Sequence, residues 1–113
     1  MINVIDYNKA QEAETPHGVS VRKLFESEHV QVIEIMLKPG EGLKKHITPV
    51  DVFFYVLEGT GFVEIGEERA AVSRDMLVES PGGIPHRLAN ESDADFRFLV
   101  VKTPRPTTAT RLL

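Results

Sequence analysis

The 113-residue chain contains no cysteine. This absence excludes disulfide bonds, thiolate metal sites and a cysteine nucleophile. Enzyme classes that depend on a reactive thiol are therefore not candidates. A site for a transition metal would have to use nitrogen and oxygen ligands, which histidine and carboxylate side chains supply.

Long apolar runs are also absent. No window of the sequence approaches the length of a membrane span, and residues 1–10 lack the basic start and apolar stretch of a signal peptide. We therefore expect no membrane partner and a cytoplasmic location.

The chain has no excess of basic residues. Its 17 Asp and Glu residues outnumber its 13 Lys and Arg residues, which gives a formal net charge of -4. A field of this sign repels phosphate backbones, so nucleic acid is not an expected partner. No serine has the flanking glycines of a nucleophile elbow, and no glycine-rich phosphate loop leads into a helix. Serine-triad and kinase-like enzymes are excluded.

The chain does contain short segments rich in Val, Ile, Phe and Tyr, separated by glycine and proline clusters that are typical of turns. These segments are about 4–10 residues long, as strands are. We predict strands over residues 19–25, 29–38, 43–48, 51–57, 61–65, 69–73, 76–79, 85–89 and 94–102. Only residues 8–14 have a helical pattern, and this segment is too short to be stable without packing. The fold class is therefore all-β, a sandwich or a small barrel.

The length and the 42% hydrophobic composition fit one folded domain. No internal repeat and no long linker indicates a second domain. We expect a barrel core over about residues 19–102, preceded by an N-terminal arm of residues 1–18 and followed by an extended tail of residues 103–113.

Two stretches narrow the fold class. The first runs from Pro39-Gly40 through His46 to the segment YVLEGTG at residues 55–61, and the second is PGGIPHRLAN at residues 81–90. Together they resemble the two motifs of the cupin superfamily, in particular its small single-domain members. This resemblance implies a double-stranded β-helix, a jelly-roll-like barrel that is often a homodimer. It also implies a metal ion held inside the barrel by three histidines and one glutamate.

Only half of that ligand set is present. The resemblance places the first histidine on His46 and the last on His86, but the second falls on Thr48 and the glutamate on Val52. Asp51 precedes the glutamate position and would face the cavity only if a β-bulge turned it inward, because side chains alternate along a strand. We predict a site for divalent zinc, iron, nickel or manganese at His46 and His86, with Asp51 as a third candidate ligand. The alternative is that the two imidazoles only form hydrogen bonds inside the cavity.

The same alternation predicts the rest of the ligand pocket. Its predicted lining is Lys44, Thr48, Val52, Phe54 and Asn90. Lys44 lies two residues before His46, and an ammonium inside the cavity would favour an anionic ligand. A position at the rim would instead leave Lys44 in water. The resemblance gives Asn90 a structural role, and His17 and His29, which belong to neither motif, are predicted to lie at the surface.

Two functions stay open. The barrel could be a binding module for a small, anionic metabolite. Alternatively, it could be a metal-dependent dioxygenase, decarboxylase or isomerase that acts on a small carboxylate-bearing metabolite. No catalytic residue is predicted. An open barrel leaves edge strands and an apolar outer face with Phe53 and Tyr55, so we expect a homodimer.

Overall fold

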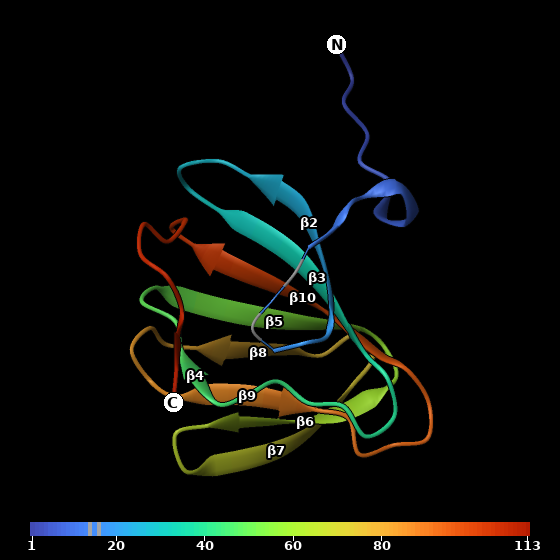
Figure 1. Ribbon diagram of the computed structural model, residues 1–113, viewed down its shortest axis with the longest axis vertical. Coiled ribbons are helices and arrows are strands. Elements are labelled where there is room, and N and C mark those ends of the chain that lie inside the picture. Colours follow the sequence, from blue (N-terminus) through green and yellow to red (C-terminus); the bar gives the residue numbers. More distant parts are fainter. Residues whose placement is uncertain (14, 16) are drawn as a thin grey trace.

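The computed structural model describes residues 1–13, 15 and 17–113, and its regular structure consists almost entirely of antiparallel strands (Figure 1). The elements in chain order are η1 (Tyr7–Lys9), β1 (Glu12–Ala13), β2 (Ser20–Glu26), β3 (Gln31–Leu37), β4 (His46–Ile47), β5 (Asp51–Glu58), β6 (Thr60–Ile65), β7 (Glu68–Ser73), β8 (Leu77–Ser80), β9 (His86–Ala89), β10 (Phe96–Thr103) and β11 (Arg111–Leu112). They form a six-stranded sheet in the order β1-β2-β3-β10-β5-β8 and a five-stranded sheet in the order β11-β4-β9-β6-β7. The prediction of an all-β fold is confirmed.

The core forms where the inner faces of the two sheets meet. In β5 the residues Val52, Phe54 and Val56 are buried and alternate with more exposed neighbours, as the period of a strand requires. Phe98 of β10 belongs to the same sheet, and Leu88 of β9 joins the cluster from the other sheet. One continuous apolar cluster therefore holds the two sheets together.

The turn between β5 and β6 depends on two glycines. Gly59 has φ +82, a conformation that side chains other than glycine rarely adopt, and a Cβ there would collide with the carbonyl oxygen of Asp95. A Cβ on Gly61 would collide with the ring of Phe96. The glycine pair that marks the end of the first motif is thus required by the close approach of β10.

The strand predicted over residues 43–48 is much shorter in the structure. Only β4, His46–Ile47, is regular, and it pairs with β9 through His46 and His86 and with β11 through both of its residues. Leu43 and His46 are buried whereas Lys44 and Lys45 between them are exposed. This spacing of three breaks the alternation that a continuous strand would impose.

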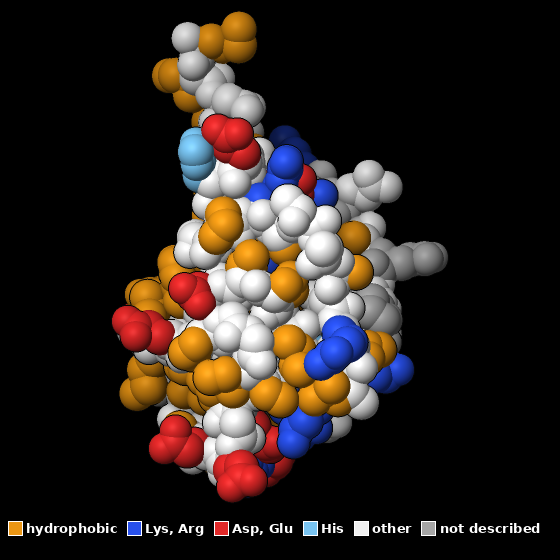
Figure 2. All heavy atoms as spheres, turned by 90° about the vertical axis from the view of Figure 1, so that its left-hand side faces the viewer, with side chains coloured by type: hydrophobic (Ala, Val, Ile, Leu, Met, Phe, Trp, Pro, Cys, Tyr) orange, Lys and Arg blue, Asp and Glu red, His pale blue; other side chains and the backbone are white. Residues whose placement is uncertain are grey.

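The secondary structure of both terminal segments differs from what the sequence predicts. The segment predicted to be helical, residues 8–14, forms the end of η1 and the strand β1, and Glu14 lies outside the described residues. The tail is not simply extended, because β11 adds to the edge of the five-stranded sheet. The first residues stand away from the body, with apolar side chains in solvent (Figures 1 and 2).

No helix among the described residues is long and apolar enough to cross a membrane.

Candidate functional site

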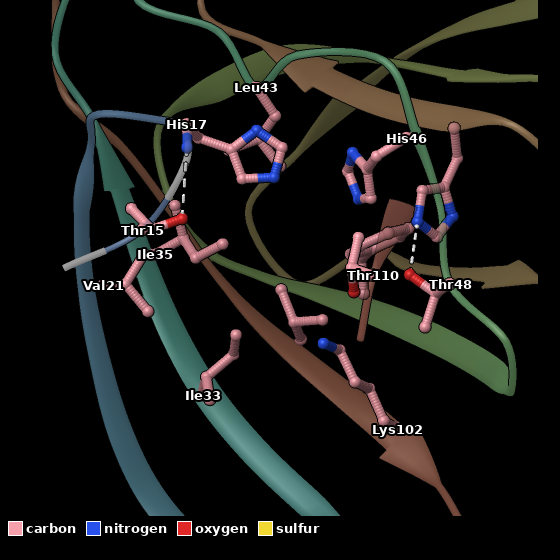
Figure 3. Close-up of a pocket in the computed structure, with 13 residues that line it drawn as sticks. Thr15, His17, Val21, Ile33, Ile35, Leu43, His46, Thr48, Lys102 and Thr110 are labelled. Carbon is pink, nitrogen blue, oxygen red and sulfur yellow. Dashed lines mark hydrogen bonds between the residues drawn. The ribbon is translucent and has the colours of Figure 1, made fainter. Parts of the chain in front are cut away.

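A cavity of about 220 Å³ inside the barrel is the main candidate site (Figure 3). Strands of both sheets contribute to it, together with the segments that precede β2, β4 and β11. Its lining is Thr15, His17, Val21, Ile33, Ile35, Leu43, His46, Thr48, Phe54, His86, Val100, Lys102 and Thr110. The surface of the walls is mainly apolar, and the ionisable groups on them are three imidazoles and one ammonium. Among the described residues, no carboxylate lines the cavity.

His46 and His86 lie next to each other in this cavity. They are register partners in the β4–β9 pair, and their ring centroids are 4.5 Å apart in an edge-on arrangement. Both side chains are buried. The two motif histidines, which are 40 positions apart in sequence, are thus brought into one site by strand pairing.

Both ring nitrogens of His86 contact hydroxyl groups. Nδ1 lies 2.7 Å from Ser80 Oγ, and Nε2 lies 3.1 Å from Thr48 Oγ1. Burial, with repulsion from His46 and Lys102, lowers the pKa of His86 to about 4, so the ring is neutral at pH 7. A neutral imidazole has one donor and one acceptor nitrogen, and the two hydroxyls satisfy both. Thr48 therefore completes the hydrogen bonding of His86.

His46 directs an unprotonated ring nitrogen into the cavity. Its Nδ1 lies 2.6 Å from the carbonyl oxygen of Lys44. A carbonyl can only accept, so Nδ1 carries the proton and Nε2 is the unprotonated nitrogen, with no hydrogen-bond partner among the described residues. Burial lowers the pKa of His46, and the charge of Lys102 lowers it further, whereas the bond to the Lys44 carbonyl opposes both. The neutral ring therefore has an acceptor facing the cavity.

His17 also lines the cavity, although the sequence analysis placed it at the surface. Its Nδ1 accepts a hydrogen bond of 2.9 Å from the backbone N–H of Lys44, and its ring centroid lies 4.6 Å from that of His46. Burial and the nearby cationic groups lower the pKa of His17 to about 4. Because Nδ1 accepts, the proton of the neutral ring is on Nε2. No motif around His17 indicates this position, which depends on a bond to a residue 27 positions away. His29 is exposed, as predicted.

The cation of the cavity is Lys102, and the prediction of Lys44 for this place is corrected. Lys44 is exposed, because it lies in the irregular segment before β4 where the assumed alternation fails. Lys102 follows Val100 by two residues in β10, so both side chains point inward. Burial lowers the pKa of the Lys102 ammonium, and no carboxylate among the described residues opposes this effect. The alternation of Phe96, Phe98 and Val100 was the sequence signal that could have found it.

The remaining predicted residues are divided between the cavity and its surroundings. Phe54 lines the cavity, whereas Val52 is buried in the core without lining it. Asp51 is exposed and accepts a hydrogen bond of 2.8 Å from Gly82 N–H. The pairing of β5 with β8 starts at Val52 without a register shift, so no bulge turns Asp51 inward and its prediction as a metal ligand is corrected.

Asn90 lies outside the cavity and holds loops together. Its amide nitrogen donates to the carbonyls of Leu37 and Ala94, at 2.9 and 2.7 Å, and its oxygen accepts from Ser92 N–H at 3.0 Å. The side chain is buried, and these bonds satisfy it. Asn90 therefore has a structural role, and its prediction as a pocket residue is corrected.

A family model described as the cupin domain matches residues 33–102. The chain is a cupin. A solved structure of TT1209 from Thermus thermophilus is 32% identical, covers 93% of this chain and 100% of that chain, and has a TM-score of 0.79. The uncharacterized protein MJ0764 of Methanocaldococcus jannaschii is 28% identical over 87 residues, 76% of this chain and 75% of that protein. The polyketide cyclase RemF of Streptomyces resistomycificus shares the fold at 20% identity, with a TM-score of 0.84 and coverage of 100% of this chain and 86% of that chain.

The structure of MJ0764 is described as an RmlC-like cupin with a double-stranded β-helix fold, and it matches this cupin with a TM-score of 0.77 over 94% of each chain at 24% identity. The predicted fold class is therefore confirmed. Shared folds at this level of identity do not assign a reaction, because cupins with one barrel carry different sites.

The described residues of this cupin do not fit the metal ion that the superfamily implies. An imidazole that ligates a metal needs an unprotonated nitrogen that is not already hydrogen-bonded, and among the described residues only His46 directs one into the cavity. The Nε2 of His17 carries a proton, and both nitrogens of His86 are bonded to hydroxyls. The ammonium of Lys102 would repel a cation. Within residues 1–13, 15 and 17–113, no group of three or more His, Asp or Glu side chains is arranged to hold a metal ion.

Proposed function

We propose that this cupin binds a small organic anion, a carboxylate-bearing metabolite, in the cavity around His17, His46 and Lys102. The observation that carries this proposal is the set of groups that line the cavity: an ammonium and three neutral imidazoles, with no carboxylate among the described lining residues. Aliphatic walls would pack against the carbon skeleton of the ligand. A volume of about 220 Å³ suits a metabolite of a few carbon atoms.

The partly buried ammonium of Lys102 favours an anion over a neutral ligand. Burial disfavours its charged form, which is why its pKa is lowered. A carboxylate in the cavity would restore a partner for this charge, and it would also accept a hydrogen bond from His17 Nε2–H. Lys44, the cation predicted for the pocket, takes no part because it is exposed.

The proposal is tested by calorimetric titration with acetoacetate and with acetylacetone. Acetylacetone has a methyl ketone in place of the carboxylate and is otherwise the same. Acetoacetate is expected to bind about tenfold more tightly or better, because a hydrogen bond to a charged group contributes roughly 1.5–3 kcal/mol. Chemical-shift changes in NMR spectra are expected at His17, His46 and Lys102. Equal affinity for the two compounds, or shifts confined to residues outside the cavity, would contradict anion binding here.

We also propose that two copies associate through the outer face of the six-stranded sheet. Tyr55 of β5 is the register partner of Leu77 of β8, and Phe53 is the partner of Val101 of β10, so apolar side chains continue across three strands. Leu77 is 52% exposed and Phe25 of β2 is 49% exposed. An apolar surface of this kind is typical of an interface. Light scattering is expected to give twice the chain mass of 12.6 kDa, and a Leu77→Glu variant half of that. A wild-type mass of one chain would refute the dimer.

A further inference from the structure

The backbone of one residue fixes the protons on two cavity histidines in opposite ways. The N–H of Lys44 donates to His17 Nδ1 at 2.9 Å, and the C=O of Lys44 accepts from His46 Nδ1 at 2.6 Å. His17 therefore presents Nε2–H to the cavity, and His46 presents a lone pair on Nε2. The two rings are neighbours, with centroids 4.6 Å apart. The cavity thus has a donor and an acceptor side by side.

The ammonium of Lys102 completes this arrangement. Figure 3 shows the second nitrogens of His17 and His46, and the amino end of Lys102, pointing into the same space. Lys102 lines the same cavity as all three rings, and its charge lowers the pKa of each of them. A base, a neutral donor and a cation therefore converge on one small volume.

We propose that His46 acts as a general base that removes a proton from carbon in a small 3-oxo acid, while His17 and Lys102 stabilise the enolate. This activity rests on the proposed anion binding, because Lys102 would hold the carboxylate of the substrate. His17 Nε2–H would donate to the ketone oxygen. Donors directed at an oxygen that becomes negatively charged are the usual means by which enzymes favour enolates.

The proton transfer is balanced within the site. The lone pair on His46 Nε2 takes a proton from C2, the carbon between the ketone and the carboxylate. The electrons of the broken C–H bond form the C=C bond of the enolate, and the negative charge moves to the ketone oxygen. The imidazolium of His46 keeps its Nδ1–H bond to the carbonyl of Lys44, which stabilises the added charge. Return of a proton from Nε2 to carbon regenerates the 3-oxo acid.

The neutral imidazole of His46 and the donors beside it are suited to a small 3-oxo acid. Burial keeps His46 neutral, and so available as a base, at pH 7. Proton transfer is efficient when base and carbon acid are matched. An ionised carboxylate acidifies the neighbouring C–H little, so the site itself has to stabilise the enolate, which the ammonium of Lys102 at the carboxylate and the N–H of His17 at the ketone oxygen would do. Binding of the carboxylate would also neutralise Lys102, whose charge otherwise weakens the basicity of His46. Substrate binding itself would therefore strengthen the base.

The activity is tested by hydrogen–deuterium exchange at C2 of acetoacetate in D₂O, followed by proton NMR. The wild-type protein is expected to accelerate exchange over buffer. His46→Asn is expected to reduce the protein-dependent rate about 100-fold or more, which is the usual contribution of a general base. The asparagine amide can replace Nδ1–H in the bond to Lys44 but has no basic nitrogen. His46→Gln also lacks a basic nitrogen and serves if the asparagine variant does not fold.

Two controls separate this activity from binding and folding. The exchange rates are compared at saturating acetoacetate, so that any change in the affinity of His46→Asn does not enter the comparison. His29→Asn changes an exposed histidine and is expected to exchange at the wild-type rate. A wild-type protein that binds acetoacetate without accelerating exchange, or a His46→Asn variant that exchanges at full rate, would overturn the base and leave anion binding standing. Absence of binding by the wild type would overturn both proposals.

Discussion

The free energy of unfolding is expected to fall steeply as the pH decreases from about 6.5 to about 4. The folded-state pKa values of His17 and His86 are about 4, whereas the ordinary value is 6.5. Between these values the unfolded chain binds protons that the folded chain excludes, so acid favours unfolding. For His86, which is 2% exposed, the shift corresponds to roughly 3 kcal/mol. His17 is only partly buried, so solvent reduces its contribution.

Urea denaturation at pH 7.5 and at pH 5 measures this effect. His86→Asn is expected to reduce the difference between the two pH values, because the variant lacks the imidazole with the lowered pKa. His29→Asn is the matched control, since His29 is exposed, and it should leave the difference unchanged. An equal free energy of unfolding for the wild type at both pH values would show that the buried imidazoles are not held neutral.

Much of the fold follows from local sequence patterns. The alternation of apolar residues in β5 and β10 predicts strands whose inner faces the structure buries. The glycines at 59 and 61 mark a turn that no larger residue fits. The second motif places His86 at the start of β9, where pairing with β4 brings it opposite His46. These features are predictable because each depends on residues that are close in sequence or on one regular period.

The rest of the site depends on irregular backbone and distant contacts. Lys44 was assigned to the cavity by assuming that a strand extends from residue 43 to residue 48, but only His46–Ile47 is regular. The cation is instead Lys102, for which the regular alternation of β10 holds. His17 reaches the cavity through a bond to the backbone of Lys44. No pattern around His17 encodes a bond between two irregular segments, so sequence alone could not find it.

The exchange of Lys102 for methionine is expected to reduce acetoacetate affinity about 30-fold or more. Loss of one partner from a buried, hydrogen-bonded charge pair costs roughly 2 kcal/mol or more. Methionine has a similar length, so it should fill the same part of the cavity wall, which Val100 and Ile33 also line. Removal of a partly buried charge that has no carboxylate partner among the described residues should not destabilise the ligand-free protein. A normal melting temperature would confirm that the variant is folded.

Lys44→Met is the matched control. It removes the same charge from the lysine that the sequence placed in the cavity and the structure places in solvent, and it leaves intact the backbone groups that bind His17 and His46. Its affinity for acetoacetate is expected to stay within about twofold of the wild-type value, since an exposed charge contributes little.

The measurement that tests the account most directly is therefore a calorimetric titration of acetoacetate into the wild-type protein, Lys102→Met and Lys44→Met under identical conditions. The cavity predicts tight binding by the wild type and Lys44→Met, and weak binding by Lys102→Met alone. Equal binding by all three proteins, or a loss of affinity in Lys44→Met rather than in Lys102→Met, would contradict an anion site built around Lys102.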